Sequence, residues 1–292
     1  MNRYLALTCA SILAVAAGPM TAAAQPADNY HFSLKAERDN PGKIHGTFTT
    51  DREGRDDNHW STGFLPSELT GLEVSSFRGA GTRPIHFAIV REAGRLDCAG
   101  NGGGSMAEGS CRFTASPAFT QLLVSRGIAR PDAEQAFGLM AVNARREVVD
   151  AVAAAHYPTP TIDNLLALSA LGVDGDYING MARAGYRPQS IQSLVEFKAL
   201  DITPEWIAGF ARVGYANVPG DGLVQLKALR VTPDYVAGFQ QLGYRNMPVD
   251  QLVELKALDI TPEFVRANVG RQAVMPGIKE LVDLKLFGRH RM

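Results

Sequence analysis

LVQLKALRVTPDYVAGFQQLGY, residues 223–244, is the most informative stretch of this chain, because similar copies precede and follow it. LVEFKALDITPEWIAGFARVGY occupies residues 194–215, and LVELKALDITPEFV begins at residue 252. A fixed period of this kind is typical of architectures in which neighbouring units stack on one another. The copies define four successive units of 29 residues without insertions: Asp163–Ile191, Gln192–Gly220, Asp221–Val249 and Asp250–Ile278.

Each unit is predicted to fold as two helices. The LVxLKAL segment places Leu223, Leu226 and Leu229 on one face of the first helix. A Thr-Pro-acid triplet then marks the start of the second helix. Thr is a good N-cap, Pro is favoured at the first helical position, and an acid suits the positive end of the helix dipole. A Gly-Tyr pair such as Gly214-Tyr215 ends the helix, since Gly suits a left-handed conformation.

The period extends beyond these four units. Glu134–Ile162 is a degenerate upstream unit, and a helix between Phe119 and Arg130 is predicted to cap it. Lys279–Met292 is a partial unit at the other end. We therefore predict a helical repeat domain over residues 117–292, folded as an α-solenoid of helix pairs.

Three glycines occupy one position inside the second helix of successive units, namely Gly180, Gly209 and Gly238. A glycine there costs about 1 kcal/mol relative to alanine. The recurrence indicates either that a neighbouring helix approaches closely or that the glycine was copied by duplication without selection.

Residues 28–116 are predicted to form a β domain. Tyr30, Phe32 and Leu34 alternate with polar residues, and similar alternation recurs over residues 44–49 and 85–89. Period-2 alternation is typical of strands with one buried face, and the strand spacing favours a small antiparallel sandwich or barrel. The chain is thus expected to be an α+β multidomain protein with an N-terminal antiparallel β sandwich or barrel and a C-terminal α-solenoid.

Residues 1–24 are predicted to be a signal peptide. Arg3 supplies a positive start, Leu5 to Ala17 is apolar but short for a membrane span, and small residues before Gln25 fit a cleavage site. Without cleavage the same segment would be an anchor. We expect a cut near Ala24, no membrane span afterwards, and a periplasmic or secreted protein.

Two cysteines, Cys98 and Cys111, remain after that cut. An even pair in an oxidising compartment favours a disulfide, and a pair of reactive thiols is the alternative. Both cysteines lie in the predicted arms of one hairpin, with Gly100 to Gly109 as its loop. Facing strand positions bring Cβ atoms near bridging distance, so a cross-strand disulfide is expected.

Local motifs give little indication of catalysis. The sequence contains no HExxH, GxSxG or Walker-type pattern. His31, His45 and His86 are predicted on strands, where they either belong to a polar sheet face or meet as a metal or acid–base site. The formal net charge of −1 gives no basic excess for nucleic acid. We predict no catalytic residues, no metal, no cofactor and no nucleic-acid partner.

Four lysines recur with the period, at Lys198, Lys227, Lys256 and Lys285. One interpretation is a line of contacts for an acidic partner. The other is structural: each lysine packs its stem along the helix and pairs with an acid such as Glu205, Asp234 or Glu263.

The motifs Leu223-Val224-Gln225-Leu226-Lys227-Ala228-Leu229 and Val231-Thr232-Pro233-Asp234-Tyr235-Val236 resemble a helical repeat of the LVELKALGVTPEYV type. This repeat is found in exported and membrane-anchored bacterial proteins, including zinc-metallopeptidase sensors to which it is appended. The resemblance covers about residues 134–292 and implies a repeat fold. The peptidase motif is missing from this sequence, so protease activity does not carry over.

Stacked repeats commonly serve as protein- or peptide-binding scaffolds. The first functional hypothesis is therefore an exported, non-enzymatic binding protein with a protein or peptide partner in the cell envelope. The second is a carbohydrate- or small-ligand-binding protein that acts through the β domain, which exposed aromatic residues on a loop at His59-Trp60 would favour. The third is a hydrolase with a site assembled from distant residues.

Overall fold

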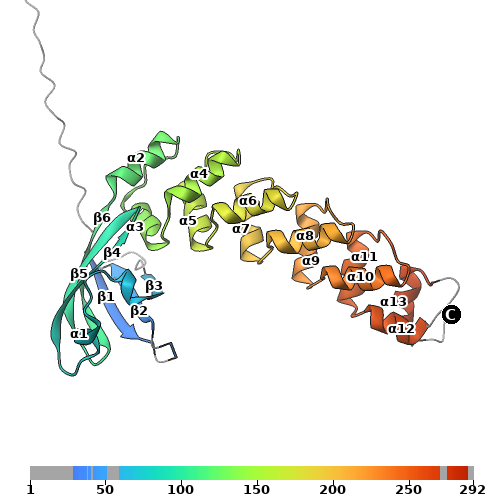
Figure 1. The fold of residues 1–292 in the computed structure, drawn as a ribbon, viewed down its shortest axis with the longest axis horizontal. Coiled ribbons are helices and arrows are strands. Elements are labelled where there is room, and N and C mark those ends of the chain that lie inside the picture. The colour runs from blue at the N-terminus through green and yellow to red at the C-terminus, as the bar shows by residue number, and fades with distance from the viewer. Residues whose placement is uncertain (1–28, 38, 41, 51–58, 270–274, 289–292) are drawn as a thin grey trace, which may run out of the picture.

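The computed structural model describes residues 29–37, 39–40, 42–50, 59–269 and 275–288 (Figure 1). Within them the chain is α+β: an antiparallel six-stranded sheet in the N-terminal half precedes 12 helices. The predicted signal peptide, its cleavage site and Arg291-Met292 lie outside the described residues. Among those described, no helix has the length and apolar character needed to cross a membrane.

The strands form one open sheet in the order β3-β2-β1-β6-β5-β4, with every neighbouring pair antiparallel. The predicted sandwich or barrel is not confirmed, because β3 and β4 end the sheet instead of meeting each other. The strands are β1 (Asn29–Ala36), β2 (Ile44–Thr50), β3 (His59–Phe64), β4 (Arg83–Arg91), β5 (Gly94–Gly103) and β6 (Met106–Ala115).

Helices cover the apolar face of this sheet. Tyr30, Phe32 and Leu34 are buried on that face, as the alternation predicts. The short helix α1 (Val74–Arg78), which follows the 3-10 turn η1 (Pro66–Glu68), buries Phe77 in the same core. At the other end Phe137 stacks on Tyr30, with ring centroids 4.0 Å apart. The core is therefore closed by helices where a second sheet was expected.

The hairpin between β5 and β6 is tighter than predicted. Its loop is the pair Gly104-Ser105, not the whole stretch from Gly100 to Gly109. Both loop residues have positive φ, 61° and 69°, as a two-residue hairpin turn requires. The glycines instead lie within the strands, where a Cβ on Gly100 would come 2.1 Å from the Glu108 carbonyl oxygen. Glycine thus permits a close crossing of the two strands.

The helices repeat with the predicted period. The second helix of each unit begins 29 residues after the second helix of the preceding unit. The predicted capping helix α2 follows the same register, because Pro117 precedes Arg146 by 29 residues. These helices are α2 (Pro117–Ser125), α4 (Arg146–Ala154), α6 (Gly175–Arg183), α8 (Pro204–Arg212), α10 (Pro233–Gln241) and α12 (Pro262–Val269). The first helices are α3 (Ala133–Ala141), α5 (Ile162–Ala170), α7 (Ile191–Ala199), α9 (Gly220–Ala228), α11 (Val249–Ala257) and α13 (Ile278–Phe287).

The array extends away from the sheet in two rows of helices (Figure 1). In one row α4, α6, α8, α10 and α12 contact each other in succession, and in the other α5 contacts α7 and α11 lies between α9 and α13. The predicted caps are present, since the hydroxyls of Thr203 and Thr232 accept hydrogen bonds from the backbone of Trp206 and Tyr235. Each turn thus fixes the start of the next helix.

Two consecutive charged residues at the end of β4 join the sheet to the array. The Arg91 guanidinium donates hydrogen bonds to the carbonyl oxygens of Met140 and Ala141 at the end of α3. The Glu92 carboxylate accepts one from the first backbone N–H of α4, at Arg146. Each charge matches the helix end it meets. The sheet core also continues into α2, α3 and α5, so the boundary placed between residues 116 and 117 stays a prediction.

Candidate functional site

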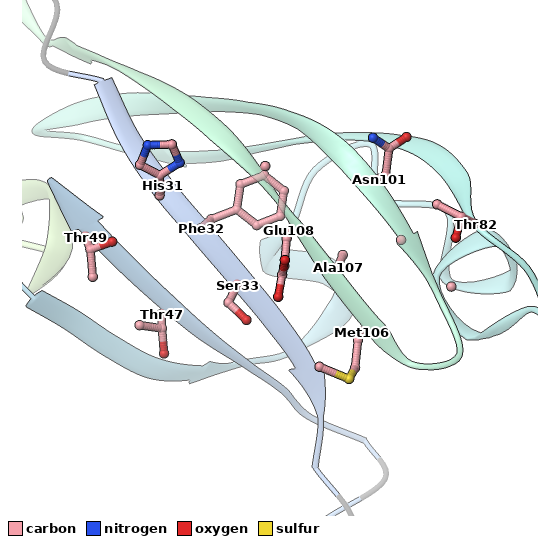
Figure 2. A pocket seen from close by; sticks show the side chains of 13 residues that line it. His31, Phe32, Ser33, Thr47, Thr49, Thr82, Asn101, Met106, Ala107 and Glu108 are labelled. Carbon is pink, nitrogen blue, oxygen red and sulfur yellow. The ribbon is translucent and has the colours of Figure 1, made fainter. Parts of the chain in front are cut away.

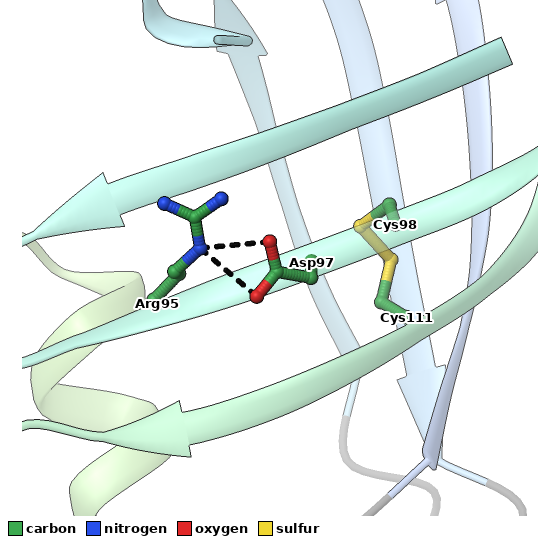
Figure 3. The surroundings of a disulfide bond; sticks show 4 residues. All are labelled: Arg95, Asp97, Cys98 and Cys111. Atoms are coloured by element: carbon green, nitrogen blue, oxygen red, sulfur yellow. Dashed lines mark hydrogen bonds and ion pairs between the residues drawn. A yellow bond between two sulfur atoms is a disulfide. The ribbon is translucent and has the colours of Figure 1, made fainter. Parts of the chain in front are cut away.

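Cys98 and Cys111 form a disulfide bond between β5 and β6 (Figure 3). The two residues face each other in the strand register and are buried in the sheet core. On the opposite, exposed face, Arg95 and Asp97 form an ion pair of 2.7 Å. The predicted cross-strand disulfide is confirmed, and its burial gives it a structural role in place of a reactive one.

Each of the four recurring lysines places its ammonium over an aromatic ring of the second helix of the preceding pair. The distances from Nζ to the ring centroid are between 4.6 and 5.4 Å. This is the range of a cation–π interaction. The pairs are Lys198 with Tyr177, Lys227 with Trp206, Lys256 with Tyr235 and Lys285 with Phe264.

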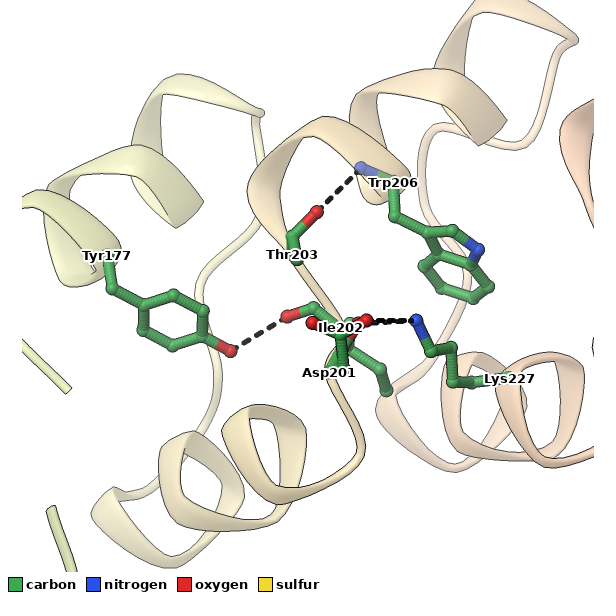
Figure 4. Close-up of polar contacts among 6 residues, drawn as sticks. All are labelled: Tyr177, Asp201, Ile202, Thr203, Trp206 and Lys227. Atoms are coloured by element: carbon green, nitrogen blue, oxygen red, sulfur yellow. Dashed lines mark hydrogen bonds and ion pairs between the residues drawn. The ribbon is translucent and has the colours of Figure 1, made fainter. Parts of the chain in front are cut away.

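Two of these lysines also bind the turn that precedes their aromatic partner. Lys227 Nζ donates to the backbone carbonyl oxygen of Asp201 and lies 3.2 Å from Asp201 Oδ2 (Figure 4). Lys285 Nζ makes the same contacts with Asp259, at 3.0 Å to the carbonyl and 3.7 Å to Oδ2. The predicted acids were wrong: Glu263, for example, pairs with Arg266. The lysine reaches the turn of the neighbouring unit because stacking brings the two together.

The lysine and its aromatic partner are both replaced in the unit that precedes Lys198. One period before Lys198 the sequence has Ser169, and one period before Tyr177 it has Val148. Ser169 Oγ is buried there without a hydrogen-bond partner among the described residues. The aromatic partners were missed in the sequence, although a shared period and this joint substitution were signals that could have revealed them. The geometry supports a structural contribution of the lysines and leaves their role in partner binding a prediction.

Tyrosine hydroxyls make further links between units. Tyr177 donates to the Ile202 carbonyl oxygen at 2.8 Å (Figure 4), and Tyr235 repeats the bond with Ile260 at 2.7 Å. Burial raises the pKa of both phenols, and the nearby carboxylates of Asp201 and Asp259 raise them further. Both tyrosines therefore stay neutral donors at physiological pH. These bonds pair loop carbonyls that helices cannot satisfy themselves.

The polar face of the sheet carries a shallow hollow of about 710 Å³ (Figure 2). Its polar lining comes from the four neighbouring strands β2, β1, β6 and β5 and from the segment before β4. Figure 2 shows His31 and Glu108 over adjacent strands, with Asn101 beyond them. The hollow offers hydroxyl, imidazole, amide and carboxylate groups to a ligand; the polar side chains are His31, Ser33, Thr47, Thr49, Thr82, Asn101 and Glu108.

The three strand histidines do not form one site. His31 and His86 are separated by β6 and β5 in the strand order, and His45 Nε2 instead lies 2.8 Å from Ser61 Oγ on the exposed face. Within the residues that the structure describes, no three His, Cys, Asp or Glu side chains gather closely enough to hold a metal ion. The interpretation as a polar sheet face fits this arrangement.

A second cavity of about 440 Å³ lies where β3 meets α3 and α5. His59 and Trp60 line it, but they begin strand β3 and do not lie on a loop as expected. Trp60 is half-buried and stacks on Phe48 at 4.8 Å. Three carboxylates that no sequence motif groups together complete the lining: Asp132, Glu134 and Asp163.

Comparison with protein-family models gives no match for this chain, and no curated protein matches it. The candidate binding surfaces of the described residues are those of the array, the hollow on the sheet and the cavity beside Trp60. The array supplies the larger and more regular surface (Figure 1). The hollows supply concave sites of the size that small ligands occupy.

Proposed function

We propose that this chain is an exported, non-enzymatic protein that binds a protein or peptide partner in the cell envelope through its helical array, an α-solenoid. The observation that carries the proposal is the repeated unit-to-unit contact: each helix row continues by the same register, away from the sheet. Stacked units of this kind present extended surfaces, which commonly bind proteins or peptides.

The exposed side chains of the array fit this proposal. The helices α4, α6, α8, α10 and α12 form one row, and each has an exposed acid as its second residue. Negative charges therefore recur along one edge of the array. These acids are Glu147, Asp176, Glu205, Asp234 and Glu263. The four recurring lysines are half-buried. They are proposed to contribute partner contacts in addition to their contacts within the array: Lys198, Lys227, Lys256 and Lys285.

Site-specific crosslinking of the full chain tests the proposal. A photoreactive residue replaces the exposed Ala228 in α9, and in a matched variant it replaces the exposed Ser110 on the sheet face. We expect a discrete protein adduct from the array position in envelope preparations. Adducts from the sheet position alone would overturn the proposal.

The cavity beside Trp60 favours a second candidate function, the binding of a carbohydrate or other small ligand at the β domain. An aromatic ring next to carboxylates is chemically suited to sugar rings and their hydroxyls. The chain has two tryptophans, so Trp206→Phe leaves Trp60 as the only indole. In that variant, N-acetylglucosamine oligomers should change the Trp60 fluorescence saturably, and Asp163→Asn should weaken the response. An unchanged spectrum would argue against this candidate.

A further inference from the structure

We propose that Arg230 and Lys256 form an anion-binding site at which the array holds a carboxylate of an acidic protein partner. The inference rests on the proposed function and names the place and the chemistry of the contact. It comes from a turn of the array at which a cation stands where both flanking turns have an acid.

Each of the four recurring lysines follows a turn residue by 26 positions; that residue is an acid for Lys227 and Lys285, and Gly172 for Lys198. Lys227 binds Asp201, and Lys285 binds Asp259, in both cases through the carbonyl oxygen and the carboxylate. By the same register Lys256 faces the turn at Arg230. A cation there replaces the carboxylate of the neighbouring turns.

Lys256 is consequently left without a counter-charge. Its ammonium lies 5.0 Å from the Tyr235 ring centroid, and within the described part of the chain it makes neither a hydrogen bond nor an ion pair. The Arg230 side chain is exposed and likewise has no ion pair among the described residues. Asp201 and Asp259, the acids in the flanking turns, are already bound by Lys227 and Lys285. Two uncompensated cations thus belong to one turn of the array.

Backbone conformation gives no reason for an arginine at this place. Arg230 has φ of +55°, in the left-handed region that favours Gly, Asn and Asp. The equivalent turns all use residues of that class: Asn143, Gly172, Asp201, Asp259 and Gly288. Arg230 therefore departs from the residue preference of this turn, and its side chain makes no ion pair among the described residues in return. Such a departure is typical of a residue retained for function.

The neighbouring unit shows which ligand the site fits. Asp201 Oδ2 lies 3.2 Å from Lys227 Nζ, so a recurring lysine already binds a carboxylate within the array itself. At Arg230 that carboxylate has to come from outside the chain. A glutamate or aspartate of a bound protein would accept hydrogen bonds from both the ammonium and the guanidinium.

Fluorescein-labelled hexaglutamate, followed by fluorescence anisotropy at low ionic strength, is a suitable probe for the full chain. We expect saturable binding at one site that weakens as salt is added. Arg230→Asp recreates the arrangement of the neighbouring turns and should weaken binding by about ten-fold or more while it leaves the melting temperature unchanged or raised. Arg245→Asp makes the same change of charge at an exposed position and should leave binding within about two-fold.

A second variant tests the pattern by gain of function. Asp201→Arg releases Lys227 and should add a second hexaglutamate site, so the stoichiometry should rise from one to two. Equal weakening by Arg230→Asp and Arg245→Asp would show diffuse charge attraction and overturn the inference. So would binding of polyphosphate but not of hexaglutamate, because a phosphate ligand is not a protein carboxylate.

The two proposals can fail separately. Crosslinking from Ala228 that persists in Arg230→Asp, together with no binding of hexaglutamate, would overturn the anion site and leave the scaffold function standing. Specific hexaglutamate binding without any protein adduct at Ala228 would overturn the scaffold function and show that the site takes carboxylates from another source.

Discussion

Gly209 of α8 lies against Pro233, the first residue of α10, so closely that a Cβ on the glycine would be 2.9 Å from the proline Cγ. Gly180 with Pro204 and Gly238 with Pro262 repeat the contact at 2.8 and 2.6 Å. Where the proline is replaced by Gly175, the preceding helix carries Ala151, 3.6 Å from a Cβ placed on that glycine. The small residue and its partner thus change together, which supports close approach over unselected duplication.

Gly209→Ala should therefore destabilise the array, although alanine is the better helix former. Propensity alone would favour alanine by about 1 kcal/mol, but forcing a methyl group against a proline ring costs about 1–3 kcal/mol. We expect a lower urea midpoint of unfolding. Gly138→Ala is the matched control, because its Cβ would meet only the flexible end of Leu166 at 3.2 Å. In a Pro233→Gly background the cost of Gly209→Ala should largely vanish, and a cost that persisted would contradict the contact.

The lysines should differ in their contribution to stability. Lys227→Met removes a cation–π contact and the bonds to Asp201, so we expect a loss of about 1–2 kcal/mol. Lys256→Met removes only the contact with Tyr235 and should cost about 0.5–1 kcal/mol. Urea unfolding of both variants measures the difference. Equal losses would show that the bonds to Asp201 contribute nothing.

The helices of the repeat could be predicted from the sequence, because their starts, ends and period are set by local signals that recur. Thr203 caps α8 and Gly214 ends it with φ of +90°, as predicted. The acid partners of the lysines could not be predicted in the same way. Asp201 meets Lys227 only because two units stack at one particular offset, and the period alone does not give that offset.

For the sheet, the faces of the strands could be predicted, but the elements that cover its core could not. Alternation predicted which side chains of β1 face the core, and the cysteines were correctly paired. What covers that core was not predictable, since Phe137 is far along the chain and belongs by sequence to the repeat. The cavity beside Trp60 follows from the same long-range packing, so its carboxylates could not be grouped in advance.

The disulfide should stabilise the β domain by constraining its unfolded state. The bridge joins residues 13 positions apart, and a loop of that size is worth about 3 kcal/mol in the chain-entropy model. A reductant should therefore lower the unfolding midpoint of the native chain. The double variant Cys98→Ser/Cys111→Ser should start at the lower midpoint and not respond to the reductant. A native midpoint that is insensitive to reduction would contradict the expectation.

Arg91 should be important for the junction between sheet and array. Burial lowers the pKa of its guanidinium, an effect that the Glu68 carboxylate opposes, and the side chain also lies 5.4 Å from the Trp60 ring centroid. Arg91→Met keeps much of the apolar stem but removes the hydrogen bonds that the guanidinium donates to the Met140 and Ala141 carbonyl oxygens, at a cost of about 2 kcal/mol. Glu92→Gln, at an exposed helix start, should cost under about 1 kcal/mol. Thermal unfolding of the two variants tests this order.

Tyr244 should make the end of the array sensitive to alkali. Its hydroxyl donates to the Pro276 carbonyl oxygen at 2.8 Å, and burial, with the Glu280 carboxylate, raises its pKa to about 12. The unfolded chain loses the same proton near pH 10. The stabilisation by this tyrosine is therefore complete below pH 10 and disappears as the pH rises from 10 to 12. Tyr244→Phe should be less stable than the native chain by about 1 kcal/mol at pH 8, and the difference should shrink above pH 10. Urea unfolding at pH 8, 10 and 11 measures both proteins, and lysine deprotonation affects them equally. A difference that stays constant across this range would mean that the phenol is not held in its neutral form by the fold.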